Sequence, residues 1–136
     1  KFVPAEFAPA DELPDPEYPF VLNTGRMLQH WHTGTMTRRT KALDEIAPEP
    51  FVEISPDDLE KLGATDGGWI RVSSRRGNIT LRARVSKKVS TGSVFVPFHF
   101  KEAAANLLTN DALDPFGKIP EFKFCAVKIE KADAPP

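Results

Sequence analysis

The sequence predicts a mainly β domain with short helices, built as a closed or nearly closed barrel. About five or six short apolar runs alternate with polar residues, and turn residues separate them. The helix-prone segments are few and do not alternate with the strands in the βαβ rhythm of a parallel sheet. With 136 residues, the chain is long enough for one hydrophobic core but too short for two domains.

The first expected strands are residues 20–22, an apolar run that leads into a polar loop, and residues 51–54. A short helix is expected directly after the second strand. Ser55 stands at the N-cap position and Pro56 at the first helical position, where each is favoured. Gly63 then follows the last apolar residue of the helix, which is the usual place for a glycine stop.

The second half of the chain predicts a hairpin. Residues 69–73 form its first strand, and Gly77 and Asn78 supply the positive φ angles that close the turn. Its second strand, residues 79–86, places the odd-numbered residues from 79 to 85 inward. The remaining expected elements are a strand at 93–96 that Pro97 ends, a helix-prone segment at 101–108 and an alternating strand at 122–129.

Both ends of the chain are expected to lack regular structure. Prolines recur through the first nineteen residues, and the acidic residues between them are expected to be solvated. We therefore assign residues 1–17 to a proline-rich linker, residues 18–131 to the folded domain and residues 132–136 to a disordered tail. The chain begins at Lys1, without an initiator methionine, and its first segment is such a linker. This suggests a piece of a longer protein.

The composition argues against several classes of protein. Lys and Arg number 18 and Asp and Glu 19, so the net charge of -1 disfavours nucleic-acid binding. There is no apolar run of membrane-spanning length and no signal-peptide pattern, which predicts a soluble, cytoplasmic protein without membrane contact. The parent complex could still associate with a membrane. The single cysteine excludes an internal disulfide and a cysteine-rich metal site.

The densest group of polar residues lies in the loop of residues 23–39. It combines Asn23-Thr24-Gly25-Arg26 with a second stretch rich in histidine, threonine and arginine that ends at Arg38 and Arg39. Backbone N–H groups, hydroxyls and guanidinium groups placed together can hold a phosphate or pyrophosphate. The alternative interpretation is a solvated basic surface loop.

A second polar cluster follows the strand that Pro97 ends. Its amide and carboxylate side chains could pair with the edge of a guanine or a pterin. The alternative is that they form turns and helix caps, the commonest task of such residues. The cluster consists of Asn106, Thr109, Asn110, Asp111 and Asp114.

Side-chain catalysis and metal binding find little support. His30, His32 and His99 could in principle form a three-histidine zinc site, but their spacing is not that of a known ligand set. Cys125 lies in an apolar strand pattern and is expected to be a buried small hydrophobe rather than a nucleophile. The chain therefore has no predicted catalytic or metal-binding residue, and we interpret it as a ligand-holding domain.

Five ordered segments carry a resemblance to a known family. They resemble the C-terminal dinucleotide-binding domain of molybdopterin oxidoreductases, in particular the catalytic subunit of molybdenum- or tungsten-dependent formate dehydrogenases. The resemblance extends from about Tyr18 to Lys131 and implies a double-psi β-barrel. The segments that carry it are residues 22–26, 32–38, 53–58, 92–99 and 105–109.

The resemblance also implies a function for the parent protein. That protein would bind bis(molybdopterin guanine dinucleotide) with Mo or W, and would oxidise formate to carbon dioxide or run the reverse reaction. The cofactor would be bound jointly with preceding domains of the same catalytic subunit, and electron-transfer subunits are possible partners. The isolated domain would be inactive, since Cys125 matches none of the family's metal-ligand or iron–sulfur cysteines.

Ten positions match family residues that lie against the cofactor. One of them departs from the family pattern: Phe122 stands where a tyrosine is common, so the hydrogen bond from that hydroxyl is lost. The implied cofactor-binding residues are Thr24, Gly25, Arg26, His32, Thr33, Thr35, His99, Asn106, Phe122 and Lys123.

Two other functions are compatible with the same residues. One is a stand-alone cofactor-binding subunit of a formylmethanofuran dehydrogenase, which shares the barrel. The other is a non-enzymatic double-psi barrel adaptor that binds proteins, in which the 23–39 loop would hold no anion.

Overall fold

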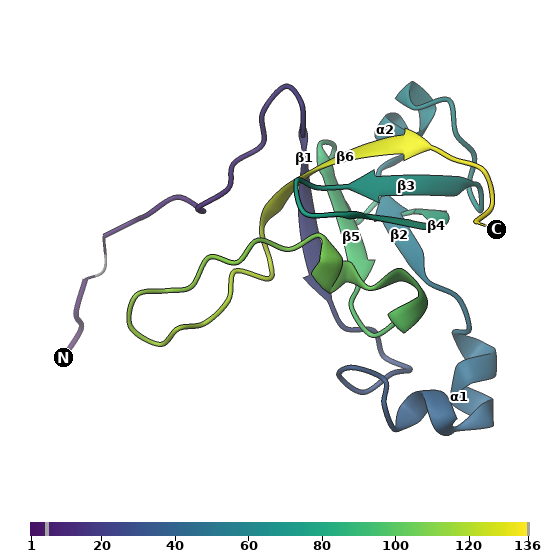
Figure 1. The fold of residues 1–136 in the computed structure, drawn as a ribbon, viewed down its shortest axis with the longest axis horizontal. Helices are drawn as coiled ribbons and strands as arrows, with labels where there is room; N and C mark the ends of the chain where they lie inside the picture. The colour runs from purple at the N-terminus through teal and green to yellow at the C-terminus, as the bar shows by residue number, and fades with distance from the viewer. Residues whose placement is uncertain (5, 136) are drawn as a thin grey trace.

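The computed structural model describes residues 1–4 and 6–135, and six strands in this part of the chain close into a barrel (Figure 1). The strands are β1 (Phe20–Gly25), β2 (Phe51–Ile54), β3 (Trp69–Ser73), β4 (Asn78–Val85), β5 (Ser93–Pro97) and β6 (Cys125–Lys131). The helical elements are α1 (Lys41–Ile46), α2 (Pro56–Lys61) and short 3₁₀ turns at Thr37–Arg39, Lys101–Ala103 and Ala105–Leu107.

The strands follow one another around the barrel in the order β1-β5-β2-β4-β3-β6, and β6 pairs with β1 to close it. The pairs β1–β5 and β2–β4 are parallel, and the other pairs are antiparallel. This closed, mainly β architecture confirms the predicted fold class. The order and the two parallel pairs fit the double-psi barrel that the resemblance implies.

The parallel pairing of β1 with β5 brings two distant loops together. Thr24 lies opposite Val96 in the register, and the Phe98 amide donates to the Gly25 carbonyl at 3.1 Å, just past the ends of both strands. The loops that follow, beginning at Arg26 and Phe98, therefore leave the barrel side by side. Both polar clusters of the sequence begin at this end of the barrel.

The barrel interior is filled by alternating apolar side chains. Along β4 every second residue from Ile79 to Ala83 is buried, as predicted. Val85 was predicted inward but is 37% exposed, because β4 ends there and the Val85 amide bonds to Asp66 Oδ1 at 2.8 Å. The fully buried core includes Leu22, Val52, Ile54, Ile70, Val72, Leu81, Val94, Val96 and Val127.

The predicted helix after β2 is present as α2. Ser55 is its N-cap, and its Oγ accepts a hydrogen bond from the Asp58 amide at 3.1 Å. The same hydroxyl donates to Asp58 Oδ2 at 2.8 Å, and that oxygen also accepts from the Gly92 amide at 2.8 Å. The cap therefore joins α2 to the turn before β5.

Ser55→Ala is expected to lower the free energy of unfolding by about 1–2 kcal/mol, the usual cost of losing a buried cap. The substitution leaves the Asp58 amide without its acceptor and removes a donor from the Asp58 carboxylate. Urea unfolding of the domain at neutral pH measures the change. Ser55→Thr keeps the hydroxyl and should recover most of the loss; equal midpoints for wild type and Ser55→Ala would contradict the capping role.

Gly77, in the turn between β3 and β4, has a different role from the predicted one. The hairpin forms, but neither Gly77 nor Asn78 has a positive φ. A Cβ at position 77 would lie 3.1 Å from the Leu107 carbonyl oxygen. The glycine is therefore needed for a close approach of two backbones rather than for its turn geometry.

Three other elements differ from the sequence prediction. The helix-prone stretch 101–108 is not one helix, because Ala104 is extended between the two 3₁₀ turns. β6 begins at Cys125 rather than at residue 122, and its first residues are buried consecutively instead of alternating. α1 was not predicted, although Thr40 precedes it and Asp44 lies in its first turn.

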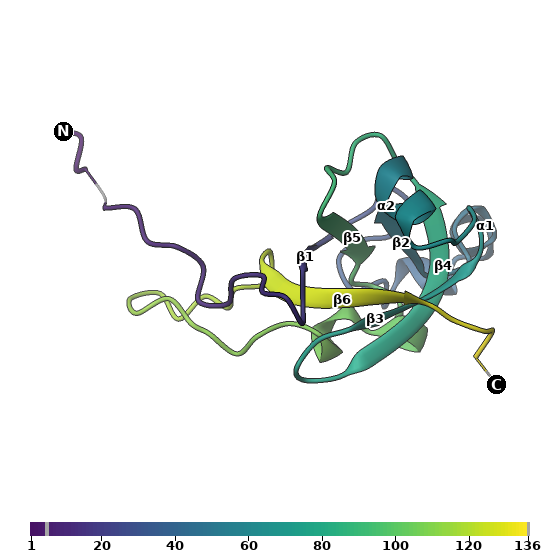
Figure 2. The same cartoon turned by 90° about the horizontal axis from the view of Figure 1, so that it is seen from above.

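The segment before β1 contains no helix or strand among its described residues, and it extends away from the barrel (Figure 2). The expectation that its acidic residues are solvated is wrong for Glu12, whose side chain is 14% exposed. The Glu12 carboxylate pairs with Arg76 and accepts from the Ala126 amide at 2.7 Å. Residue 5 of the expected linker and residue 136 of the expected tail lie outside the described residues.

Candidate functional site

The ends of β1 and β5 open into a pocket of about 250 Å³. Its residues come from four separate parts of the chain: the end of β1, the loop that follows, the segment after β5 and the approach to β6. Seven of the ten implied cofactor-binding residues line it. The lining consists of Thr24, Arg26, His32, Thr33, Phe98, Asn106, Phe122 and Lys123.

Two hydrogen bonds fix the approach to β6 against β1. Thr24 Oγ1 donates to the Phe122 carbonyl at 2.7 Å, and the Lys123 ammonium donates to the Thr24 carbonyl. The Thr24 side chain is buried, so its hydroxyl proton serves to position residues 122 and 123. This contact uses the backbone of Phe122 and does not require the tyrosine hydroxyl that the family pattern would place there.

Gly25 lies beside this pocket at the end of β1. A Cβ on Gly25 would lie 2.5 Å from Phe95 Cε2 and 3.8 Å from Lys123 Nζ. Glycine therefore lets the aromatic ring of Phe95 and the amine of Lys123 lie close to the β1 backbone.

Phe98 forms an aromatic wall of the pocket. The His32 ring packs edge-on to it with centroids 5.5 Å apart, and the Arg26 guanidinium carbon lies 5.9 Å from its centroid. Arg26 is exposed and has no ion-pair partner among the described residues. His32 has a φ of +48°, a left-handed conformation that is uncommon outside glycine and concentrates at functional sites.

Thr35 and His99 line a neighbouring pocket of about 400 Å³. Thr33 belongs to both pockets, and its hydroxyl is 2.9 Å from that of Thr35. Nine of the ten implied site residues therefore line two adjacent recesses, which share Thr33.

His99 is buried without a partner for either ring nitrogen in the described part of the chain. Its ring packs at a tilt against His30 and Phe100, with centroid distances of 4.6 and 3.9 Å. Burial, with a smaller effect from His30, lowers the pKa of His99 to about 4. The imidazole is therefore neutral at pH 7, with one donor and one acceptor unused.

His30 is the better-satisfied member of the histidine pair. Its Nε2 lies 3.0 Å from the Ala47 carbonyl, which can only accept, so Nε2 carries the proton. Its Nδ1 accepts from the Thr37 hydroxyl at 3.2 Å. The sequence did not predict His30 as a site residue, and the structure places its ring against that of His99.

Arg38 is not the free cation that the loop composition indicated. Its guanidinium pairs with Asp44 at 3.0 Å and with Glu102 at 2.6 Å, and it lies over the Phe100 ring at 5.0 Å. Arg38 therefore links the loop to α1 and to the segment after β5.

Residues 20–126 match the family of the Molydopterin dinucleotide binding domain. The chain belongs to this family. It is 55% identical over 131 residues to the F420-dependent formate dehydrogenase subunit alpha of Methanocaldococcus jannaschii, covering 96% of this chain and 20% of that protein. It is 51% identical over 126 residues to the F420-dependent formate dehydrogenase 1 subunit alpha of Methanococcus maripaludis, covering 93% of this chain and 19% of that protein.

The molydopterin domain thus spans about one-fifth of the length of these curated relatives. Among solved structures, acetylene hydratase from Pelobacter acetylenicus superposes with a TM-score of 0.76 at 20% identity. The match covers 85% of this chain and 19% of that chain. At this identity the likeness shows the fold alone.

The second polar cluster contributes little to the two recesses of this molydopterin domain. Asn110 donates to Glu121 Oε2 at 2.9 Å and to the Phe124 carbonyl at 3.2 Å, and its Oδ1 accepts from the Ala112 amide at 3.1 Å. Asn110 is therefore a turn residue, as the alternative interpretation held. Of the five polar residues in that cluster, Asn106 lines the pocket at β1 and β5.

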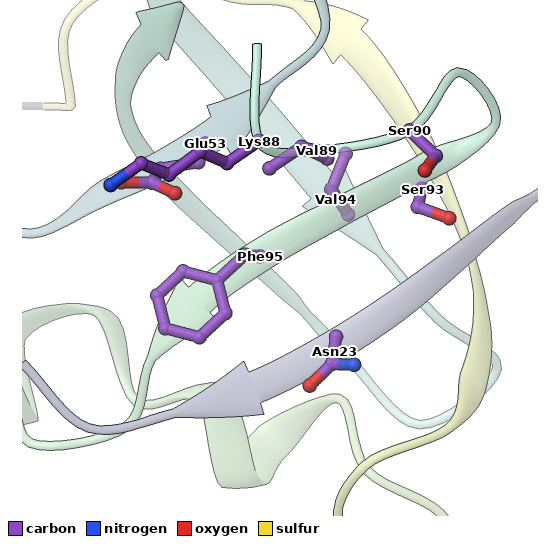
Figure 3. Close-up of a pocket in the computed structure, with 8 residues that line it drawn as sticks. All are labelled: Asn23, Glu53, Lys88, Val89, Ser90, Ser93, Val94 and Phe95. Carbon is purple, nitrogen blue, oxygen red and sulfur yellow. The ribbon is translucent and has the colours of Figure 1, made fainter. Parts of the chain in front are cut away.

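Another depression, of about 350 Å³, lies over β1, β5 and the loop before β5 (Figure 3). Asn23, Glu53 and Phe95 are among its lining residues. None of the implied cofactor-binding residues lines it. It lies on the outer surface of the barrel, apart from the two recesses.

Neither a metal site nor a reactive thiol emerges from the described residues. Within the described ranges, 1–4 and 6–135, no group of three or more His, Cys, Asp or Glu side chains is arranged to hold a metal ion. Cys125 is buried, and burial raises the pKa of its thiol to about 11. It is the small buried hydrophobe that the sequence predicted.

None of the helices that the structure describes has the length and apolar character of a membrane span.

Proposed function

We propose that this domain forms one wall of a molybdopterin guanine dinucleotide site in a formate dehydrogenase subunit. That subunit would oxidise formate to carbon dioxide or run the reverse reaction. The observation that carries the proposal is the convergence of seven implied residues, from four parts of the chain, on one pocket. The identity to two formate dehydrogenase alpha subunits supports the same assignment.

The donor set of the two recesses fits such a ligand. Arg26 offers a planar fork and Thr33 a hydroxyl, both suited to phosphate oxygens. Asn106 offers an amide that can pair with either edge of a pterin or guanine. The unpartnered buried His99 beside the second recess fits a missing polar neighbour.

The cofactor, with Mo or W, supplies the redox chemistry when bound. This chain's own residues would position it and donate hydrogen bonds to it, and none of them is assigned a catalytic role. Neighbouring domains of the same subunit would enclose the rest of the cofactor, and electron-transfer subunits would complete the enzyme. The isolated domain is expected to be inactive.

Titration of the domain with GDP is expected to give weak, salt-sensitive NMR shift changes, because other domains would enclose most of the ligand. The changes should centre on residues 24–35 and 99–111. A titration with adenosine diphosphate is the matched control, because it keeps the diphosphate and replaces the guanine base. Tight submicromolar binding, or shifts confined to other parts of the barrel, would contradict the assignment.

Arg26→Ala in the full-length subunit is expected to lower the pterin and metal content of the purified enzyme, since the guanidinium fork would meet a phosphate or pterin oxygen. Arg26→Lys keeps the charge but loses the fork, so it should restore the content only in part. The melting temperature of the domain should barely change, because Arg26 is exposed and has no ion-pair partner within residues 1–4 and 6–135. Unchanged cofactor content in Arg26→Ala would mean that Arg26 is only a surface charge.

The other two functions gain no specific support. The two relatives described above are named as formate dehydrogenase subunits rather than formylmethanofuran dehydrogenase subunits or adaptors. The formate dehydrogenase assignment therefore remains the proposal.

A further inference from the structure

Asn106 reaches the cofactor recess from a very short structural element. It is the middle residue of the 3₁₀ turn Ala105–Leu107, and it is exposed where it lines the recess. Ala105 and Leu108, on either side of it, are fully buried. A 3₁₀ turn of three residues makes few hydrogen bonds of its own, and their geometry is poor. The direction of the Asn106 side chain therefore depends on what this turn packs against.

The turn between β3 and β4 provides that support. Figures 1 and 2 both place it beside the 3₁₀ turn, which is drawn in green. Arg76 donates to the Leu108 carbonyl from Nε at 3.1 Å and from Nη2 at 2.8 Å. Gly77 lies so close to Leu107 that a Cβ on the glycine would be 3.1 Å from the Leu107 carbonyl oxygen. The two carbonyls that directly follow Asn106 are therefore both held by the β3–β4 turn.

Arg76 is itself held in place. Its Nη1 and Nη2 both donate to the Glu12 carboxylate, and its amide donates to Ser74 Oγ at 3.2 Å. The Ser74 amide donates to the Gly77 carbonyl at 2.8 Å and closes the turn. Neither Arg76 nor Gly77 lines either cofactor recess. Their route to a ligand in the recess therefore runs through Asn106.

We propose that Arg76 and Gly77 are positioning residues for the cofactor, which hold the Asn106 amide at the angle that a ligand in the recess requires. The proposal rests on the proposed function, in which Asn106 pairs with the edge of a guanine or a pterin. A hydrogen bond weakens steeply as its distance and angle depart from the optimum. A small displacement of the 3₁₀ turn is therefore enough to loosen the hold of this wall on the dinucleotide.

Gly77→Ala in the full-length subunit tests the proposal, because the added Cβ pushes on the Leu107 carbonyl without removing a hydrogen-bonding group. The purified subunit should lose bound guanine nucleotide about fivefold faster, the effect of losing one hydrogen bond. Nucleotide that remains on the subunit is measured after timed incubation and gel filtration. Arg76→Lys keeps the charge but loses the fork that reaches Leu108, so it should act in the same direction.

Two comparisons separate positioning from a general loss of stability. Ser55→Ala weakens the cap of α2, which lies outside both recesses, and should leave the rate of nucleotide loss unchanged. If Gly77 acts through Asn106, Gly77→Ala combined with Asn106→Ala should lose nucleotide no faster than Asn106→Ala alone. Additive effects of the two substitutions, or a wild-type rate in Gly77→Ala, would overturn the proposal.

Amide exchange distinguishes failure of this inference from failure of the cofactor assignment. Gly77→Ala should accelerate exchange at the Leu107 and Leu108 amides, which close the 3₁₀ turn. Unchanged exchange at these amides would overturn the positioning role and leave the cofactor assignment standing. Faster exchange, together with a wild-type rate of nucleotide loss in Asn106→Ala, would remove Asn106 from the cofactor site and this inference with it.

Discussion

Replacing Arg76 with alanine is expected to lower the free energy of unfolding by about 2–3 kcal/mol, the cost of stranding a mostly buried carboxylate and a carbonyl. The guanidinium pairs with Glu12 through two nitrogens, one of them at 3.0 Å. Its Nε and Nη2 also donate to the Leu108 carbonyl at 3.1 and 2.8 Å. Arg76 therefore joins the N-terminal segment, the β3–β4 turn and the segment that carries Asn106.

Urea unfolding at neutral pH measures this loss, and amide exchange in residues 106–110 reports whether the segment loosens. Arg75→Ala is the matched control. Arg75 pairs with Asp15, lies over the Tyr18 ring at 4.5 Å and reaches Glu12 Oε1 only at 3.5 Å, and its side chain is 39% exposed. Its replacement should cost less than about 1 kcal/mol, as for a surface pair. Equal losses for the two variants would contradict the linking role of Arg76.

The pH dependence of Arg76→Ala gives a second check. The hydrogen bond from Arg76 lowers the pKa of Glu12 below its unfolded value of 4.5. Glu12 therefore stabilises the fold above pH 4.5, and this contribution disappears as the pH falls through the folded-state pKa. Arg76→Ala should lose most of that acid-dependent destabilisation. If wild type and Arg76→Ala lose the same stability as the pH falls below 4.5, the Glu12–Arg76 pair contributes nothing to the free energy of unfolding.

The barrel strands could be predicted because their signals are local. The alternation from Ile79 to Ala83 and the cap at Ser55 each depend on residues within a few positions of one another. The pairing of Glu12 with Arg76 has no such signal, since 64 positions separate the two residues. The role of Glu12 therefore emerged only with the folded barrel, where the segment before β1 meets β6.

In the candidate site, too, contacts between residues far apart in the sequence could not be predicted. Arg26 and Arg38 are indistinguishable in a basic loop, yet Arg38 is neutralised by Asp44 of α1 and by Glu102 after β5. Only the fold decides which guanidinium stays available. Likewise, Phe122 was assigned to the site by the family resemblance alone. In the structure its backbone carbonyl accepts a hydrogen bond from Thr24.

The buried His99 is expected to make the domain less stable in mild acid. The pKa of His99 is lowered from 6.5 to about 4, chiefly by burial, so between these values the unfolded chain binds more protons than the folded one. Stability should therefore fall as the pH drops from 7 toward 4. Between pH 7 and pH 5 the expected loss is about 2 kcal/mol. Urea unfolding at a series of pH values measures it.

His99→Phe tests the assignment of this loss. The ring fills a similar space against His30 and Phe100 and has no nitrogen to leave unpaired, so stability at pH 5 should rise relative to wild type. Glu102 and Arg38, the charged groups that act on His99, remain in the variant, as does His30. The difference between the two proteins is therefore the titration of His99 itself. If His99→Phe loses as much stability as wild type between pH 7 and pH 5, the acid sensitivity comes from another group. The neutral His99 would then no longer be evidence for a polar ligand at this position.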